Sequence, residues 1–243
     1  MNYKFHPNIW MTLATFVMLA LCIKLGMWQY DKAETRRSLQ TQLNTRLSES
    51  AVALPNKVAD LENWRYKRVK FTGQYDIRYQ LMLDNQVQNT VAGYHVLTPM
   101  KVEGSDIYVL VNRGWIARAA AQVGELPKPP TFDTPAGVLE IEGDIGLPTN
   151  KFFTLEAAPA KDGAWQRVWQ HLDMQRYAQT VPFKMQPFIV RLDPKSHAGG
   201  FVRSWPPPGE RVTIHLGYAY QWFGFALTLL VIFIVLNIKK VER

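Results

Sequence analysis

The chain has 243 residues, a formal net charge of +8 and one cysteine. A single cysteine excludes an internal disulfide and a thiolate metal cluster, and the five histidines form no pair at i+3 or i+4 that would indicate a local metal site. No nucleotide-binding, zinc-protease or serine-hydrolase motif is present, and the basic residues are dispersed, so nucleic acid is not an expected partner.

Two apolar segments, residues 9–28 and 218–238, lie on either side of residues 29–217. A hydrocarbon core about 30 Å thick needs roughly 20 apolar helical residues, and both segments reach this length. Lys24 interrupts the first segment one turn from its end, where a lysine can extend its side chain to the interface. No small-residue cleavage site follows, so we expect an uncleaved anchor and two membrane helices around one extramembrane domain.

Beyond Trp28 the helical pattern continues. Leu39, Leu43 and Leu47 recur every fourth residue among polar side chains, which gives one apolar stripe on a helix. Pro55 ends this helix at the latest, because a proline cannot continue the backbone hydrogen bonds of a helix interior.

The next part of the chain is dominated by segments in which apolar and polar residues alternate. Such a period of two predicts half-buried antiparallel strands. The expected strands are 69–75, 79–87, 91–98, 107–111 with its continuation to 115, 139–145, 167–172 and 188–192. The sequence therefore predicts an α+β membrane protein, with two transmembrane helices flanking one mostly antiparallel β domain.

Three local signals refine this prediction. A turn is expected at Asn89-Thr90, and a short helix at 173–179 with Asp173 as its N-cap. Two proline-rich connectors are also present, and consecutive prolines hold a stiff extended conformation that would fix the distance of the domain from the membrane. They contain Pro127, Pro129, Pro130 and Pro135 in the first and Pro206, Pro207 and Pro208 in the second.

The densest basic stretch contains four cations, and a solvated strand face is its simplest interpretation. Attraction to anionic lipid headgroups is the alternative. The stretch consists of Arg65, Lys67, Arg68 and Lys70.

His215 is the histidine with the most distinctive surroundings. It precedes the second apolar segment, and on a helix His215, Tyr218 and Trp222 share one face at i, i+3 and i+7. Trp28 and Gln29 stand at the matching depth of the first segment, so a polar and aromatic rim is expected at one membrane surface. An aromatic belt with an interfacial histidine has this pattern and is common. The sharper hypothesis is a neutral imidazole that binds haem iron.

Arg113 and Trp115 also stand out, at the end of a predicted strand. Arg113 could pair with an acidic group such as a haem propionate, or be satisfied locally. Trp115 is most simply an aromatic residue of the core or of a strand edge.

Five motifs, in this order and spacing, resemble the surfeit locus protein 1 family from about Gly26 to Phe223. They are Leu25-Gly26-Met27-Trp28-Gln29, Leu83-Asp84-Asn85, Gly93-Tyr94-His95-Val96-Leu97-Thr98-Pro99, Val111-Asn112-Arg113-Gly114-Trp115 and the segment His215-Leu216-Gly217-Tyr218-Ala219-Tyr220-Gln221-Trp222-Phe223. Five positions depart from the family pattern. Lys32 and Arg36 stand where arginine and lysine are expected, and these exchanges keep the charge. Gln86 replaces a usual arginine, Ala117 a proline and Ile214 an asparagine. Gln86 carries no charge, which puts an anion-binding role at that position in doubt.

The resemblance implies a non-enzymatic assembly factor for haem-copper terminal oxidases, cytochrome c oxidase above all. It implies assistance in the delivery or insertion of haem a into the oxidase catalytic subunit. His215 becomes the candidate haem ligand, with Tyr218, Trp222, Trp28 and Arg113 beside the cofactor. Gln29, Trp115 and Gln221 are the expected partner contacts, and no other metal is expected.

The expected location is the bacterial inner membrane, with the domain in the periplasm and both chain ends in the cytoplasm. Proteins of haem a synthesis and other assembly proteins are further possible partners, together with membrane lipid. A periplasmic ligand sensor and a membrane-bound enzyme are the alternative functions. The sensor would need an intracellular effector, which five residues after the second segment cannot form, and the enzyme would need a convergent catalytic cluster.

Overall fold

The computed structural model of the chain describes residues 2–119, 129–148 and 165–241. Contacts divide the chain into two units. Met1–Asn44 and Pro206–Arg243 form the first, which we call the membrane unit, and Thr45–Trp205 forms the second, which we call the β domain. The predicted domain limits, 29 and 217, both fall inside helices that run past them.

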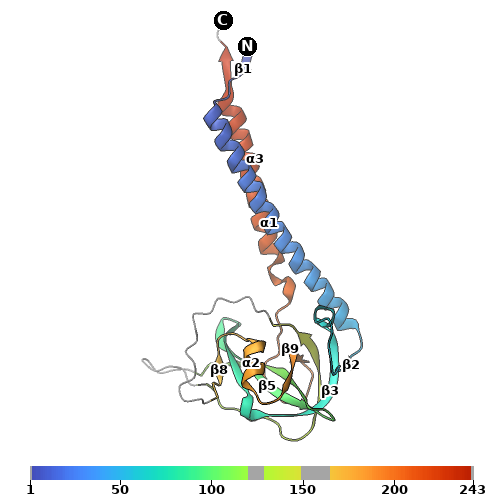
Figure 1. The fold of residues 1–243 in the computed structure, drawn as a ribbon. Helices are drawn as coiled ribbons and strands as arrows, with labels where there is room; N and C mark the ends of the chain where they lie inside the picture. The colour runs from blue at the N-terminus through green and yellow to red at the C-terminus, as the bar shows by residue number, and fades with distance from the viewer. Residues whose placement is uncertain (1, 120–128, 149–164, 242–243) are drawn as a thin grey trace. The chain divides into compact units, whose positions relative to one another are not determined.

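Both segments predicted to cross the membrane form long apolar helices. Helix α1 (Ile9–Ser48) contains the first apolar segment, continues beyond it and ends before Pro55, as predicted (Figure 1). Asn8 caps its start, because Asn8 Oδ1 accepts a hydrogen bond from the backbone N–H of Trp10 at 2.9 Å. Helix α3 (Val212–Asn237) contains the second segment except for its last residue, Ile238, which begins a strand. Both helices are long and apolar enough to cross a membrane.

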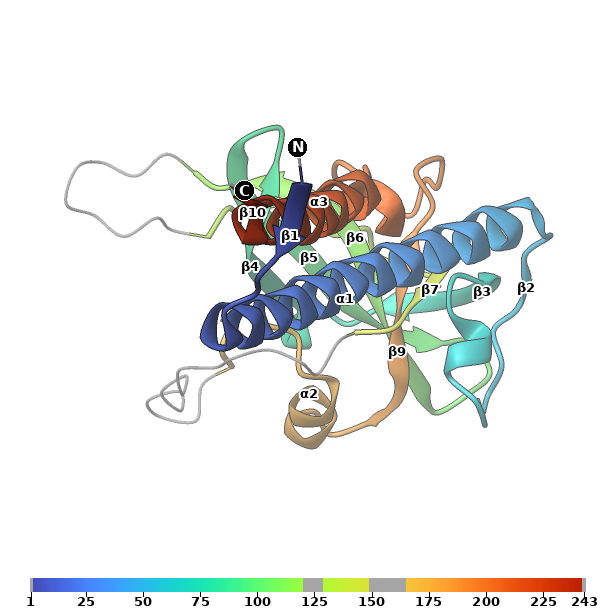
Figure 2. The same ribbon diagram turned by 90° about the horizontal axis from the view of Figure 1, so that it is seen from above.

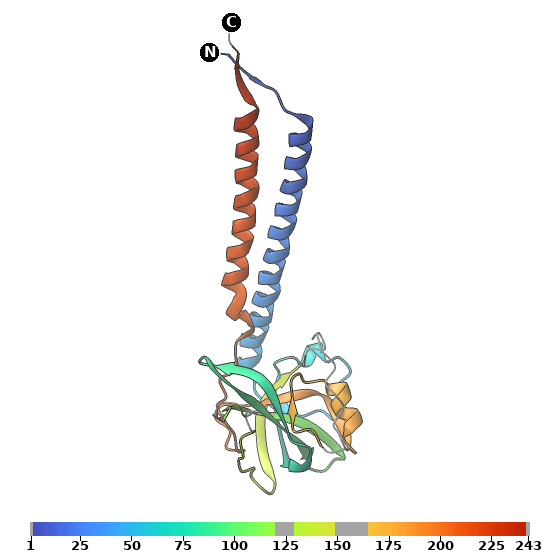
Figure 3. The ribbon, with the colours of Figure 1, turned by 90° about the vertical axis from the view of Figure 1, so that its left-hand side faces the viewer.

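Within the membrane unit, α1 and α3 run side by side (Figure 3). They approach closely at Gly26, where an added Cβ atom would lie 2.5 Å from the ring of Phe223. The 3-10 helix η4 (Pro208–Arg211) begins at the last of the three consecutive prolines and directly precedes α3. Its Gly209 N donates to Gln40 Oε1 of α1 at 2.9 Å. These contacts hold the two helices in a fixed register.

A two-stranded ribbon follows at the other ends of the helices. Strand β1 (Asn2–Phe5) pairs antiparallel with β10 (Ile238–Val241). The sequence patterns did not predict this ribbon, because each strand has only four residues.

In the described part of the β domain there are one eight-stranded sheet and one α-helix. Each strand prediction matches a strand, although β8 is shorter than predicted and β9 begins earlier. The strands are β2 (Val52–Ala53), β3 (Arg68–Tyr75), β4 (Leu81–Gln88), β5 (Val91–Val102), β6 (Ile107–Ala117), β7 (Leu139–Gly146), β8 (Val168–Trp169) and β9 (Lys184–Leu192). Short 3-10 helices, η1 (Glu62–Trp64) and η2 (Ile77–Tyr79), precede β3 and β4.

Five of these strands close into a barrel, and this closure corrects the predicted antiparallel sheet. The ring runs β3-β7-β9-β6-β5 and returns to β3 through a β3–β5 pairing. A closed ring of five strands cannot alternate direction throughout, so at least one neighbouring pair must be parallel. That pair is β6–β9, and the short strands β2 and β8 add parallel pairings with β3 and β4. The sheet is therefore mixed. The alternation of apolar and polar residues along one strand shows which of its faces is buried. It does not show whether the neighbouring strand runs parallel or antiparallel to it.

The barrel interior follows the predicted alternation. In β3 every second residue from Val69 to Tyr75 is buried, and β7 buries Ile141 and Ile145. Together with residues of β5, β6 and β9 they form the main core, and full burial of such a side chain stabilises the fold by about 1.5–3 kcal/mol.

The short helix α2 (Met174–Thr180) covers a second core. Asp173 is its N-cap, as predicted, and accepts a hydrogen bond from Arg176 N at 3.0 Å. Tyr177 is fully buried, and the helix lies against β9 (Figure 2).

The predicted turn lies at Asn89 and Thr90, both with positive φ (48° and 66°), between β4 and β5. Gly93 lies after this turn, within β5. In the first proline-rich connector, Pro127 lies outside the described residues. In the second connector Pro207 is extended and Pro208 begins η4, and the predicted stiffness of this connector stays a prediction.

Candidate functional site

In the membrane unit, His215 and Gln29 form a hydrogen-bonded pair between the two helices. Helix α3 has begun by His215, as the shared-face prediction required, and Gln29 lies at the predicted matching depth on α1. His215 Nδ1 lies 2.8 Å from Gln29 Oε1. The sequence predicted the common depth of these two residues but not the bond between them.

This bond selects one tautomer of the imidazole. An amide oxygen only accepts hydrogen bonds, so the proton of the neutral ring is on Nδ1 and the lone pair is on Nε2. Histidines that bind metals commonly have this arrangement, in which the second ring nitrogen donates to an oxygen that fixes the orientation of the ring. His215 is half-buried. The pair therefore offers one oriented nitrogen ligand, which suits the iron of a haem.

Aromatic side chains stand around this pair. On α3, Tyr218 is half-exposed, and Trp222 is half-buried with its ring edge-to-face against Phe225 at 5.8 Å. On α1, Trp28 is 51% exposed, and Lys32 Nζ lies 5.9 Å from its ring centre. Flat exposed rings beside a nitrogen ligand can stack on a planar macrocycle, and in a membrane they can equally lie at the level of the headgroups.

Gln221, the remaining predicted partner contact on α3, is exposed. Its side chain is thus available to a neighbouring protein.

In the β domain, Arg113 is 1% exposed and bonded to neutral oxygens of its own chain. Its Nη1 donates to Thr134 Oγ1 at 2.7 Å and to Gln80 Oε1 at 3.3 Å. Its Nε donates to Gly199 O and its Nη2 to Asp133 O, both at 3.4 Å. Arg113 thereby connects β6 to two loops.

Three aromatic rings enclose the same guanidinium. The centres of the Tyr75, Phe132 and Phe201 rings lie 5.2, 5.8 and 5.1 Å from Arg113 Cζ, a distance typical of cation–π contacts. Burial raises the pKa of Tyr75 to about 12, so this ring stays neutral. Burial also lowers the pKa of Arg113. A propionate would have to enter this interior to reach Arg113, and this predicted pairing stays a prediction.

Trp115 is a strand residue that packs on a glycine. Its Nε1 donates to Gln86 O at 2.9 Å, and a Cβ atom at Gly93 would overlap its ring and Ile116 O. Gly93 thus makes room for the indole across the strand pair.

Two further motif residues lie in this part of the sheet. Asp84 forms an ion pair with Arg118, and Gln86 Nε2 donates to Asp84 O at 2.9 Å. Arg118 also stacks on Tyr94. Three of the quoted motifs thus contribute to one structural cluster in β4, β5 and β6.

His95 is a motif residue with a structural role that the sequence did not separate from the other histidines. Its Nδ1 lies 3.4 Å from Asn112 Nδ2, and its ring packs edge-to-face on Trp205 at 5.5 Å. Burial and the charge of Arg191 lower the pKa of His95 to about 4. Among the described residues, no group of three His, Cys, Asp or Glu side chains could hold a metal ion.

The basic stretch on β3 and before it is paired within the domain. Arg65 pairs with Glu62, Lys67 lies 4.5 Å from the centre of the Trp64 ring, and Lys70 pairs with Glu140 at 2.9 Å. These contacts favour the solvated-face interpretation over attraction to lipid.

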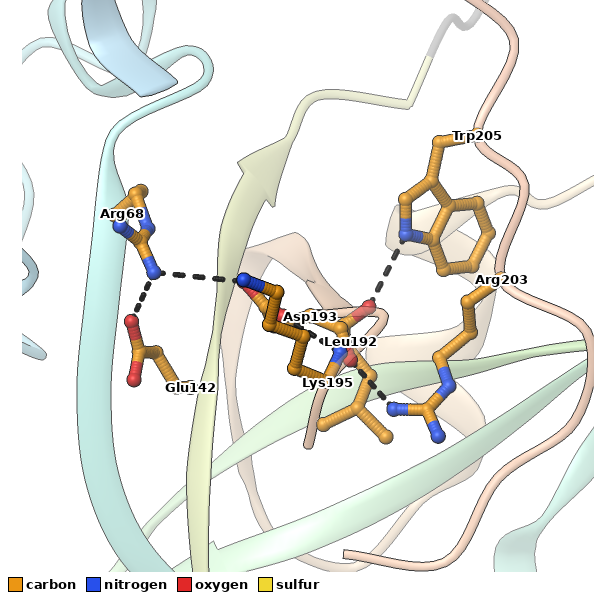
Figure 4. A network of polar contacts seen from close by, with 7 residues as sticks. All are labelled: Arg68, Glu142, Leu192, Asp193, Lys195, Arg203 and Trp205. Carbon is orange, nitrogen blue, oxygen red and sulfur yellow. Dashed lines mark hydrogen bonds and ion pairs between the residues drawn. The ribbon is translucent and has the colours of Figure 1, made fainter. Parts of the chain in front are cut away.

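Arg68 belongs to a polar network that holds the segment after β9 (Figure 4). It pairs with Glu142 and with Asp193, whose carbonyl oxygen accepts from Arg203. Trp205 Nε1 donates to Leu192 O at 3.1 Å. A hollow of about 570 Å³ lies beside this network. Among the residues that line it, Arg68 forms ion pairs with Glu142 and Asp193, and these ion pairs contribute to the stability of the fold.

The chain is similar to known proteins over nearly its whole length. The profile of the SURF1 family matches residues 16–227. A "SURF1-like protein" of Rickettsia bellii is 27% identical over 226 residues, which cover 91% of this chain and 87% of that protein. "Surfeit locus protein 1" of Mus musculus is 26% identical over 233 residues, covering 87% of this chain and 71% of that protein. "Surfeit locus protein 1" of Takifugu rubripes is 26% identical and covers 95% and 99%.

Proposed function

Because this chain belongs to the SURF1 family, we propose that it is a membrane-anchored assembly factor for a haem-copper terminal oxidase, cytochrome c oxidase above all. In this proposal it holds haem a as cargo and assists its delivery to the catalytic subunit. The membrane unit anchors it in the bacterial inner membrane, with the β domain in the periplasm.

The observation that carries the haem proposal is the hydrogen bond between His215 and Gln29. It fixes the imidazole in the tautomer that leaves Nε2 free, and it joins the two membrane helices at the level where aromatic side chains gather. A bound haem would take Nε2 as an axial ligand to its iron, and Trp28, Tyr218 and Trp222 supply flat surfaces for its ring.

A transient carrier must also release its cargo. One imidazole is a weaker hold than two axial ligands, and His215 is only half-buried. Solvent access lowers the penalty of breaking the bond to iron, because water can replace the lost ligand. The single ligand therefore suits delivery better than permanent storage.

In this proposal the β domain supplies a folded surface for partner proteins and no ligand to the haem iron. Arg113, which is buried, is bonded to oxygens within the domain. The exposed surface of the domain is the part left for an oxidase subunit or for other assembly proteins.

The test uses membranes from cells that lack this chain. We expect a lower rate of cytochrome c oxidation and a smaller haem a signal in the reduced-minus-oxidised spectrum, both restored by the intact chain. His215→Ala should fail to restore them. His6→Ala is the matched control, because His6 is an exposed histidine of the same unit outside both helices.

Unchanged oxidase activity and spectrum in cells without the chain would overturn the assembly role. Full restoration by His215→Ala would overturn the ligand assignment while leaving the assembly role in place.

A further inference from the structure

The ribbon of β1 and β10 places two lysines directly opposite each other. Lys4 is the register partner of Lys239 in this antiparallel pair. Directly opposed residues project from the same face with Cβ atoms about 5 Å apart, and like charges in this position destabilise the pairing. Both lysines are exposed.

No acidic side chain of the described ribbon relieves this repulsion. Neither strand contains Asp or Glu, and neither lysine takes part in an ion pair within the described part of the chain. The register nevertheless holds, because other contacts secure the ribbon. His6 N donates to Asn237 O at 2.9 Å, and Phe5 packs edge-to-face on Phe233.

The opposite face of the ribbon carries exposed apolar side chains. Phe5 pairs with Ile238, and Tyr3 projects to the same side because side chains alternate along a strand. Tyr3, Phe5 and Ile238 are 62, 52 and 44% exposed. The ribbon thus has the opposed pair of lysines on one face, and on the other the aromatic and aliphatic positions together with Lys240, the register partner of Tyr3. It lies directly beyond the ends of two apolar helices.

We infer that this ribbon binds the phosphodiester headgroup of an anionic phospholipid between Lys4 and Lys239. The phosphate supplies the negative charge that the register lacks. Tyr3, Phe5 and Ile238 face the acyl boundary, where aromatic and aliphatic side chains of interfacial segments are favoured. Charge complementarity and the position beyond the membrane helices select lipid over an acidic protein segment.

The inference is independent of haem binding, since it involves none of the residues around His215. Each lysine near an anionic surface contributes about fivefold to affinity at moderate salt. Removing both should therefore lower the preference for anionic lipid by roughly 25-fold.

The first experiment compares the full chain in nanodiscs of phosphatidylcholine with and without phosphatidylglycerol, and counts retained lipids by native mass spectrometry. We expect the wild type to retain phosphatidylglycerol preferentially and the double variant Lys4→Gln, Lys239→Gln to lose this preference. The control, Lys57→Gln with Lys195→Gln, removes the same charge from exposed positions of the β domain and should retain it. Equal preference in the double variant and the wild type would overturn the inference.

The second experiment separates lipid binding from loss of the ribbon. Lys4→Glu converts the repulsive pair into an ion pair, so hydrogen exchange of the backbone amides of β1 and β10 should slow in phosphatidylcholine alone. Added phosphatidylglycerol should slow this exchange in the wild type and leave Lys4→Glu unchanged. Protection of the wild type by an acidic peptide but not by phosphatidylglycerol would contradict the assignment to lipid.

Discussion

His215 in the membrane unit and Arg113 in the β domain both lie in motifs found in the sequence analysis, but they differ in how many of their polar atoms are hydrogen-bonded within the chain. Arg113 is buried, and its donors reach four oxygen atoms of the domain. His215 has one ring nitrogen bonded to Gln29, and its other ring nitrogen has no hydrogen-bond partner within the described residues. The difference suggests that a motif residue is available to a ligand only where the fold leaves one of its polar atoms unused.

The two histidines of the motifs make the same contrast. The half-buried ring of His95 lies against Asn112 and Trp205, and burial with the charge of Arg191 lowers the pKa of this histidine. His215 is half-exposed at the start of a helix. His95 therefore belongs to the fold, and His215 is the better candidate for binding.

The largest expected effect is on Arg113, whose replacement would remove the centre of the domain's polar interior. We expect Arg113→Met to lower the free energy of unfolding by about 3 kcal/mol, because buried oxygens lose their donors while the methionine fills part of the space. Denaturant unfolding of the full chain in detergent, followed by tryptophan fluorescence, measures this change. Arg78→Met is the control, since the exposed Arg78 pairs with Asp76 at the surface. A variant as stable as the wild type would mean that Arg113 is not needed by the fold.

The second prediction concerns the pH dependence that His95 gives to the domain. The pKa of His95 is about 4 in the fold, whereas an unfolded histidine titrates near 6.5. Between these values the unfolded chain binds more protons, so stability falls as the pH falls from about 6.5 to about 4, by up to about 3 kcal/mol. Above this window His95 is neutral in both states and adds no pH dependence.

A comparison with His95→Gln isolates this effect. Burial raises the pKa of Asp144, so protonation of that carboxyl favours the folded state and acts in the opposite direction. Both proteins keep Asp144, so the difference between their denaturation midpoints at each pH reports His95 alone. Parallel midpoint profiles would show that His95 does not resist protonation in the fold.

The smallest expected effect is at the β4–β5 turn. Thr90 has a φ of 66°, which is costly for a β-branched residue, and asparagine followed by glycine is preferred in such turns. Thr90→Gly should raise the midpoint of denaturation by an amount equivalent to about 1 kcal/mol. It should leave haem binding unchanged, because the variant alters only the stability of the β domain. A change in haem binding in this variant would contradict the assignment of haem binding to the membrane unit alone.

Much of the fold could be predicted from local patterns. Alternation located the buried residues of β3 and β7, Asp173 indicated the start of α2, and the apolar segments located both long helices. The parallel β6–β9 pair could not be predicted, since it follows from closing five strands into a ring. The ribbon escaped prediction because pairing between residues 2–5 and 238–241 leaves no local pattern.

The site was partly predictable for a similar reason. Helical spacing placed Gln29 and His215 at one depth, but the bond between them depends on how the two helices pack. Arg113 counts as polar in any sequence pattern, so its burial is visible only once Gln80, Thr134 and Gly199 are seen around it.

The most direct measurement is a haem titration of the purified full chain in nanodiscs, followed by the Soret absorption. We expect His215→Ala to lose the histidine-ligated spectrum, and Gln29→Leu to keep it with roughly 10- to 100-fold weaker affinity, as is typical when the partner of a metal-binding histidine is removed. His95→Gln should bind like the wild type. An unchanged spectrum and affinity in His215→Ala would contradict the assignment of His215 as the ligand that the fold leaves free.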